Sequence, residues 1–145
     1  MGKKLDGLQK VIRGEVPPPP MATLVGFNLV AAKFGEVVIE FDASSRHANP
    51  MGSLHGGILC DVADAAMGMS FASTLEDDES FTTLELKINF LKPVWSDKLR
   101  AVGKIVKRGR TVGMAECDVT NSKGEIVARS SSTCLVLRGE QASGR

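Results

Sequence analysis

The sequence lacks several features that would assign it to common functional classes. None of its apolar stretches is long enough to cross a bilayer, which excludes a transmembrane helix. It has neither a G-x-x-x-x-G-K-S/T nor a G-x-G-x-x-G motif, which removes the usual nucleoside-triphosphate and dinucleotide sites. Its formal net charge is only +1, which argues against a general nucleic-acid binder. Any bound anion must therefore meet a local basic cluster.

Cysteine is also scarce. The three cysteines, Cys60, Cys117 and Cys134, are odd in number and have no C-x-x-C spacing, so neither a disulfide framework nor a zinc site is indicated. They lie in apolar segments, and we expect buried free thiols. Residues 1–10 are charged and lack the apolar core of a signal peptide, so we expect a cytoplasmic protein.

The hydrophobic pattern predicts one domain, 1–145, with its core at about 22–138 and an N-terminal helix at about 4–14. A hairpin is predicted over 24–41, followed by a long, almost uniformly apolar helix over 58–72 that is typical of a buried helix. The later segments predict strands over 83–90, 99–107, 111–120 and 125–137. Because no helices separate these strands, we predict an α+β fold, one antiparallel sheet wrapped around a central helix.

The segment from Asn49 to Asp64 carries the residues best suited to chemistry. Gly56 and Gly57 stand where a polar loop enters the helix, and the first amides of a helix have no internal partner. Glycines let a ligand approach these amides closely, which makes a donor site for a carbonyl oxygen that becomes an oxyanion. Asn49 and His55, beside this point, can orient the loop or the substrate by hydrogen bonds.

Asp64 is a carboxylate inside an apolar helix, which is costly unless the group is paired or used. It can serve as a general base on water or as a nucleophile. Gly57 lies seven residues earlier, about 10 Å along one helix, so one reacting carbonyl cannot easily touch both. Antiparallel helices from two subunits would bring Gly57 of one near Asp64 of the other, which suggests a symmetric dimer.

Each of these residues also has a purely structural interpretation. A lone helical Asp is often exposed or paired with a base, and Asp61 lies near the helix start, where the dipole favours acids. His55 can simply bond to backbone, His47 is expected to be exposed and structural, and Gly-Gly is a common turn. Only the combined order from Asn49 to Asp64 is specific.

That combination resembles the hotdog-fold thioesterases, specifically the PaaI-like and 4-hydroxybenzoyl-CoA thioesterase type. The pattern N-x-x-G-x-x-H-G-G, followed by an acid in the helix, is formed here by Asn49, Gly52, His55, Gly56, Gly57 and Asp64. The coarse element order is also similar, from about residue 22 to 138. In that branch the acid lies nine positions after the His, which selects Asp64 over Asp61.

The resemblance implies that the Gly57 amide polarises a thioester carbonyl, while Asn49 and His55 organise the loop and hold the thioester or the water. Asp64 of the other subunit would then activate water or attack directly. The family often has a hydroxyl residue at the start of the long strand to support this acid. The family register selects Thr83 for this role.

Strict alternation instead puts Thr82 on the apolar face with Leu84, so both threonines qualify, and we choose Thr83. We expect Asp61 to point away from the pocket, because two carboxylates facing one pocket would raise one pKa.

A basic hairpin turn is the candidate for binding coenzyme A phosphates. It contains Lys107, Arg108 and Arg110, and Lys92 could contribute. Solvated turns commonly carry such charges, which is the alternative. The resemblance favours the phosphate interpretation, since related enzymes hold the nucleotide at the subunit surface near this turn.

We therefore predict hydrolysis of an acyl-CoA to free acid and coenzyme A, by a homodimer or homotetramer without a metal or redox cofactor. The acyl pocket is expected between two central helices, lined by Leu59, Val62, Met67 and Phe90, with Gly56 also contacting substrate. The absence of tyrosine and the abundance of Ala and Met permit a short aliphatic or an aryl acyl group. The alternatives are a hotdog hydratase or dehydratase and a non-catalytic acyl-CoA-binding module.

Overall fold

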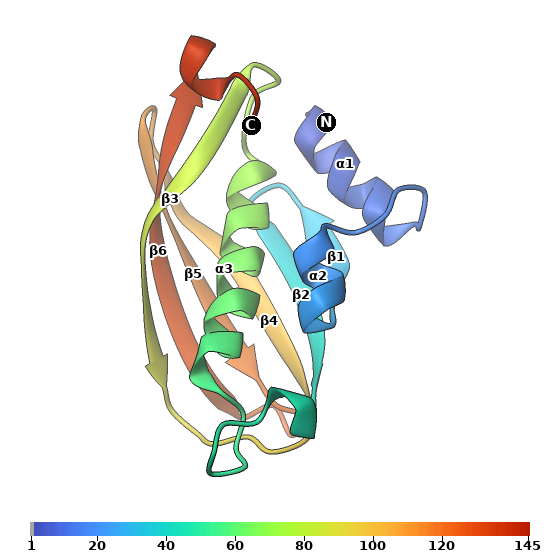
Figure 1. Cartoon of the computed structure of the whole chain (residues 1–145). Helices are drawn as coiled ribbons and strands as arrows, with labels where there is room; N and C mark the ends of the chain where they lie inside the picture. The colour runs from blue at the N-terminus through green and yellow to red at the C-terminus, as the bar shows by residue number, and fades with distance from the viewer. Residues whose placement is uncertain (1) are drawn as a thin grey trace.

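The computed structural model describes residues 2–145 as one antiparallel sheet with helix α3 packed across one face (Figure 1). The sheet has six strands in the order β1-β2-β4-β5-β6-β3. In chain order the elements are α1 (Lys3–Ile12), α2 (Pro20–Val25), β1 (Phe27–Lys33), β2 (Glu36–Ala43), the 3-10 helix η1 (Ser45–His47), α3 (Gly56–Ala72), β3 (Glu79–Phe90), β4 (Asp97–Arg108), β5 (Val112–Thr120), β6 (Ile126–Arg138) and the 3-10 helix η2 (Gly139–Ala142). The predicted α+β architecture is confirmed.

The core lies between α3 and the sheet. Alternate residues of the strands face the helix, and the fully buried side chains include Val37, Ile39, Val62, Met67 and Val119. Gly103 on β4 lets the two layers approach closely, because a Cβ at this position would overlap the Ala66 carbonyl group of α3. The glycine therefore sets how deeply α3 sits on the sheet.

The start of the predicted hairpin is wrong. Residues Pro20–Val25 form the short helix α2 instead of the beginning of a strand. Pro20 is pre-organised for a first helical turn, and Gly26 ends the helix with φ at +92°, so β1 starts only at Phe27. The N-terminal helix α1 lies close to its predicted position and packs against β1.

A bulge interrupts the predicted alternation in β3. Thr83 pairs with Cys134 and Glu85 pairs with Thr133, so Leu84 has no partner of its own in the register. Because of this extra residue, odd-numbered residues before the bulge and even-numbered residues after it point to the same face of the sheet. Thr83 therefore faces α3 together with the later apolar residues of β3, whereas Leu84 is exposed.

His47 is buried, so the expectation that it is exposed is wrong. Its Nδ1 accepts the Ser44 amide at 3.2 Å, which leaves Nε2 to donate to the Val25 carbonyl at 2.8 Å. The ring also packs edge-on against Phe41, 4.8 Å between centroids. His47 thus ties the end of α2 to the loop before α3, and its role is structural as predicted.

The cysteines are free, and two of the three are buried. Cys117 and Cys134 lie in the core, whereas Cys60 is only half-buried. Burial raises the pKa of the Cys117 thiol to about 12, so it stays protonated and unreactive. No helix within residues 2–145 is long and apolar enough to cross a membrane.

Candidate active site

The loop that leads into α3 is held by the side chain of Asn49. Its Nδ2 donates to the Ser53 hydroxyl at 2.9 Å, and its Oδ1 accepts the Met51 amide at 2.9 Å. Gly52 completes the turn with φ at +90°. Asn49 therefore orders the loop from within. Ser53 was not predicted, because a serine in a glycine-bearing loop carries no signal of its own.

Two glycines begin α3, and a ring lies over each. A Cβ built on Gly57 would be 3.1 Å from Nε2 of His55, the N-cap residue, and one on Gly56 would be 2.8 Å from Cζ of Phe90. The Ile58 amide already donates to the His55 carbonyl at 3.0 Å. The amides of Gly56 and Gly57 are thus the ones at the helix tip without an intrahelical acceptor. The structure brings the predicted donor amides, His55 and Phe90 together.

Asp64 projects from α3 and is exposed in the single chain. Although the residue is exposed, protein atoms packed around its carboxyl remove part of the surrounding water, and this effect, followed by the charge of Asp61, raises the pKa of the carboxyl above the ordinary value. Asp61 was predicted to point away from the pocket, but it lies on the same side of α3 as Asp64, since residues three apart are neighbours on a helix surface. A raised pKa moves the carboxyl toward the range in which a general base works best.

Thr83 lies on the strand that passes under this part of α3. Gly68, one turn after Asp64, packs against the Phe81 ring of β3, since a Cβ on this glycine would be 3.5 Å from the ring. This contact fixes which part of β3 lies beside Asp64. Thr83 follows Phe81 on the same face, and its hydroxyl is 3.9 Å from the Cys134 sulfur. Burial raises the pKa of that thiol, and the Asp64 charge adds to the rise. The acid and the hydroxyl thus belong to one neighbourhood.

One strip of α3 is left open by the sheet. Gly57, Asp61, Asp64 and Gly68 follow one another at spacings of four, three and four residues, which puts them on one face. Gly57 and Asp64 are exposed, and the other two are half-buried. The helix predicted to be buried on every side is therefore covered on only part of its surface within this chain.

A cavity of about 400 Å³ opens beside the helix tip. Its lining residues are Asn49, Ser53, Leu54, Gly56, Leu59, Phe90, Leu91, Lys92, Pro93 and Val94. Leu59 and Phe90 were predicted to line a pocket, and both do. Val62 and Met67 were also predicted to line it, which is wrong, because both are 0% exposed and point into the core under α3.

The predicted phosphate-binding turn has one member already engaged inside the protein. The Arg108 guanidinium bonds Glu79 at 2.7 Å and lies 5.3 Å from the centre of the Phe71 ring. Lys107 and Arg110 are exposed. Within one chain this turn lies at the end of the sheet opposite to the start of α3 (Figure 1).

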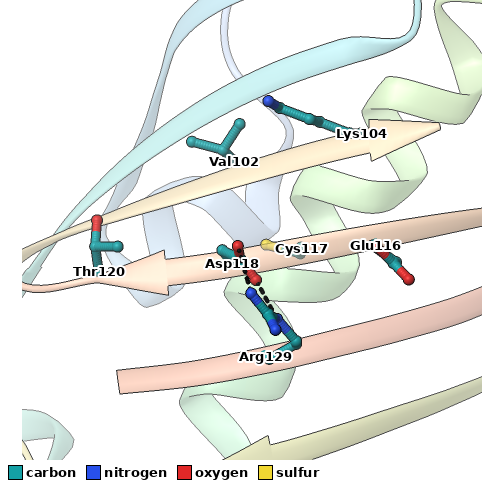
Figure 2. Close-up of a pocket in the computed structure, with 7 residues that line it drawn as sticks. All are labelled: Val102, Lys104, Glu116, Cys117, Asp118, Thr120 and Arg129. Carbon is teal, nitrogen blue, oxygen red and sulfur yellow. Dashed lines mark hydrogen bonds and ion pairs between the residues drawn. The ribbon is translucent and has the colours of Figure 1, made fainter. Parts of the chain in front are cut away.

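A second hollow, of about 320 Å³, lies across β4, β5 and β6 (Figure 2). It is lined by Val102, Lys104, Glu116, Cys117, Asp118, Thr120 and Arg129. Asp118 accepts two hydrogen bonds from Arg129, at 2.7 and 3.1 Å. This pairing lowers the pKa of the Asp118 carboxyl and raises the pKa of the Arg129 guanidinium. The alternation of the strands directs these polar side chains away from α3, so this hollow is separate from the helix tip.

Comparison with known sequences identifies the family. The model of the thioesterase superfamily matches residues 51–128. A Saccharolobus solfataricus protein that carries a provisional esterase name is 32% identical over 104 residues, 72% of this chain and 74% of that protein. Acyl-coenzyme A thioesterase 13 of Homo sapiens is 24% identical over 132 residues, 89% of this chain and 94% of that protein.

Solved structures are similar over most of the chain. A phenylacetic acid degradation-related protein of Ralstonia eutropha JMP134 is 31% identical to this chain, with a TM-score of 0.80. The match covers 88% of this chain and 98% of the Ralstonia chain. The E. coli PaaI protein has a TM-score of 0.82 over 94% and 98% of the two chains, and at 20% identity it shows the fold alone. The predicted hotdog fold is confirmed, and the chain belongs to the thioesterase superfamily of thioester hydrolases.

Proposed function

We propose that the chain hydrolyses acyl-CoA thioesters at a site shared by two subunits, with Gly57 of one and Asp64 of the other acting on the same carbonyl. The open strip of α3 carries this proposal. It holds both residues on one face, yet separates them by about 10 Å along the helix. A second, antiparallel copy of the strip would remove that separation and cover the exposed helix surface.

The edge of the sheet supports such a dimer. β3 is twelve residues long and forms one edge, so its outward backbone groups have no strand beside them within residues 2–145. A long open edge is a ready site for another strand. Pairing of two β3 edges about a two-fold axis lays the two α3 helices side by side. Light scattering is expected to give a dimer or a dimer of dimers at micromolar concentration, and a monomer would contradict the shared site.

The proposed chemistry uses only protein groups. The Gly57 amide donates to the thioester oxygen and stabilises the oxyanion as the carbonyl carbon is attacked. Asn49 and His55 hold the loop and the thioester in place. Asp64 of the partner subunit, supported by Thr83, either takes a proton from the attacking water or attacks the carbon itself as an anhydride-forming nucleophile. The C–S bond then breaks, and coenzyme A leaves as a thiolate that takes up a proton. In the water route this step releases the free acid directly, whereas in the nucleophile route it leaves an acyl–Asp64 anhydride, which a water molecule then hydrolyses to the free acid and the restored carboxylate.

A coenzyme A thioester is the proposed substrate because a relative matched over 89% of the chain is named an acyl-coenzyme A thioesterase. Hydrolysis of a panel of short, long and aryl acyl-CoAs tests this directly. Asp64→Asn is expected to lower kcat at least about 100-fold while coenzyme A still binds. Asp61→Asn, one turn earlier, is the matched control and is expected to keep most of the activity at neutral pH.

Two outcomes would redirect this proposal. Unchanged hydrolysis in Asp64→Asn would remove Asp64 from the mechanism. Binding of acyl-CoA by the unmodified protein without turnover of any thioester would favour a non-catalytic binding module. A hydratase on this fold needs an acid and a histidine acting together, whereas here His55 lies over Gly57 at the helix tip. Single-turnover hydrolysis in heavy-oxygen water separates base from nucleophile, because only the anhydride route can label the Asp64 carboxylate.

Lys107 and Arg110 remain predicted phosphate contacts. Because their turn is at the far end of the sheet from Gly57, they could meet the same coenzyme A only from the partner subunit. The tetrameric state and the cytoplasmic location likewise remain predictions.

A further inference from the structure

A small cluster of polar side chains lies between β3 and β6, on the side of the sheet that faces α3. Thr83 on β3 and Cys134 on β6 are cross-strand partners, and the Thr83 hydroxyl lies 3.9 Å from the Cys134 sulfur. Ser132 precedes Cys134 by two residues, so both side chains point to the same face of the sheet. Cys134 is 0% and Ser132 1% exposed, whereas Thr83 is half-buried. The cluster therefore runs from the core toward the helix surface.

The inner end of this cluster has an unsatisfied donor. Cys134 packs with Phe71, Leu75 and Val136 in an apolar part of the core. The Ser132 hydroxyl has no nitrogen or oxygen partner within the part of the chain that the structure describes, and the Cys134 thiol is the polar group beside it. Because a buried hydroxyl without an acceptor is costly, the Ser132 hydroxyl donates to the sulfur, although sulfur is a weak acceptor.

This donation gives the cluster a direction. The thiol has one hydrogen, and the Thr83 oxygen is the acceptor on its other side. A Thr83 oxygen that accepts from the thiol keeps its own hydrogen for a further acceptor. An ionised carboxylate accepts hydrogen bonds and donates none, so it suits the outer end of such a chain.

The carboxyl of Asp64 is near enough to be that end. Burial is the main cause that raises the pKa of the Cys134 thiol, and the charge of Asp64 adds to the rise. The other titratable groups beside Asp64 are Asp61 and Cys60 on α3 itself. Glu85 follows the bulge of β3, is exposed and accepts a hydrogen bond from a hydroxyl of β6 on the outer face. It therefore points away from the cluster.

Resting on the proposed hydrolysis, in which Asp64 is base or nucleophile, we propose that Cys134 is a positioning residue for this acid. Its thiol fixes the Thr83 hydroxyl, and that hydroxyl donates to the Asp64 carboxylate of the same subunit. The Ser132 hydroxyl holds the thiol in this orientation. No proton moves along the cluster, since each group only sets the direction of the next. The last hydrogen bond favours the ionised carboxylate, which is the reactive form.

Removal of the thiol should act on Asp64 without any contact to the substrate. Cys134→Ala lets the Thr83 hydroxyl turn away, so we expect kcat to fall about threefold. The acid side of the pH–rate profile should move to higher pH, because the carboxylate loses a donor. Cys134→Ser keeps a donor and is expected to retain most of both. Cys117→Ala removes an equally buried thiol from β5 and is the matched control, expected to move neither.

A double-mutant cycle separates this coupling from a general effect on packing. Thr83→Val removes the hydroxyl, and Cys134→Ala added to it is expected to move the acid side of the profile no further. Ser132→Ala is expected to move it in the same direction as Cys134→Ala, but less. Additive shifts in the cycle, an unchanged profile in Cys134→Ala, or an equal shift in Cys117→Ala would overturn the proposal.

A titration without turnover separates this proposal from the proposed reaction. Heteronuclear NMR of the Asp64 side-chain carboxyl follows its pKa directly in the unmodified protein and in Cys134→Ala. A higher pKa in Cys134→Ala, together with no hydrolysis of any acyl-CoA, would support the positioning role and remove the reaction. Hydrolysis that depends on Asp64, with the same carboxyl pKa in both proteins, would keep the reaction and overturn the role of Cys134.

Discussion

The ring of Phe90 lies directly over Gly56, so close that a Cβ on the glycine would come within 2.8 Å of the ring carbon Cζ. This contact joins the last residue of β3 to the first residue of α3. It therefore sets where the donor amides of the helix tip stand relative to the cavity beside them.

Gly56→Ala should disturb this contact. The added methyl group must displace the Phe90 ring, and we expect kcat/KM to fall roughly tenfold because the amides at the helix tip move with it. The double variant Gly56→Ala with Phe90→Leu gives the methyl group room and is expected to recover much of the loss. Steady-state kinetics on both variants checks this, and no recovery in the double variant would show that the ring is not the obstacle.

The raised pKa of Asp64 predicts the acid side of the pH profile. The active form is the carboxylate, so kcat/KM should fall as the pH drops through the raised pKa, at a higher pH than for an ordinary aspartate. Asp61→Asn removes the second cause of the rise, so its acid limb should move to lower pH. A limb that stays in place in Asp61→Asn would contradict the assignment of Asp64 as the titrating group.

Two serines on β6 give a matched test of buried hydroxyl groups. The Ser130 hydroxyl donates to the Lys87 carbonyl at 2.8 Å, whereas the buried Ser132 hydroxyl has no nitrogen or oxygen partner within residues 2–145 and only the Cys134 thiol, a weak partner, beside it. Ser130→Ala should therefore cost about 1 kcal/mol in the free energy of unfolding, and Ser132→Ala should be neutral or stabilising. Chemical denaturation of the two variants measures this, and the opposite order would show that Ser132 has a partner in solution.

Glu79 joins the ends of three strands. Burial alone would raise its pKa, but hydrogen bonds from the Glu76 amide and from Arg138, with the charges of Arg108 and Arg138, lower it instead. Glu79→Gln leaves two arginines facing a neutral group, so we expect a loss of about 2 kcal/mol, moderated by the partial exposure of both arginines.

The pH dependence of this loss follows from the lowered pKa. The ionised Glu79 contributes its stability above the unfolded-state pKa, and that contribution disappears as the pH falls through the lower folded-state value. The difference between wild type and Glu79→Gln should therefore be full at neutral pH and shrink in acid. Urea denaturation at several pH values tests it, and a constant difference would mean that packing rather than charge is lost.

The central helix and the succession of strands along the chain were predictable because they depend on local patterns. A simple meander after the helix was expected, which is wrong for β3, because this strand pairs with β6 at the edge of the sheet and not with β4. The uniformly apolar run of α3 and the polar, glycine-bearing loop from Asn49 to His55 can each be recognised from a short stretch of consecutive residues. The candidate acid and donor amides lie on one helix at a spacing that the sequence states directly.

The features that were missed depend on contacts between distant residues. Nothing near Arg108 shows that Glu79, 29 residues away, holds its guanidinium. His47 is buried only because Val25, 22 residues earlier, ends a short helix above it. The side of β3 that Thr83 faces depends on a bulge, and a bulge becomes visible only when the partner strand is known.

That bulge has a consequence for how the strand tolerates change. The pairs on either side of Leu84 join consecutive residues of β6, so β6 has no gap opposite the extra residue. Shortening β3 by this one position keeps every cross-strand pair and every inward-facing side chain in place. A chain without Leu84 is therefore expected to fold on the same register, whereas removal of Thr83 would put Leu84 opposite Cys134 in place of the threonine hydroxyl.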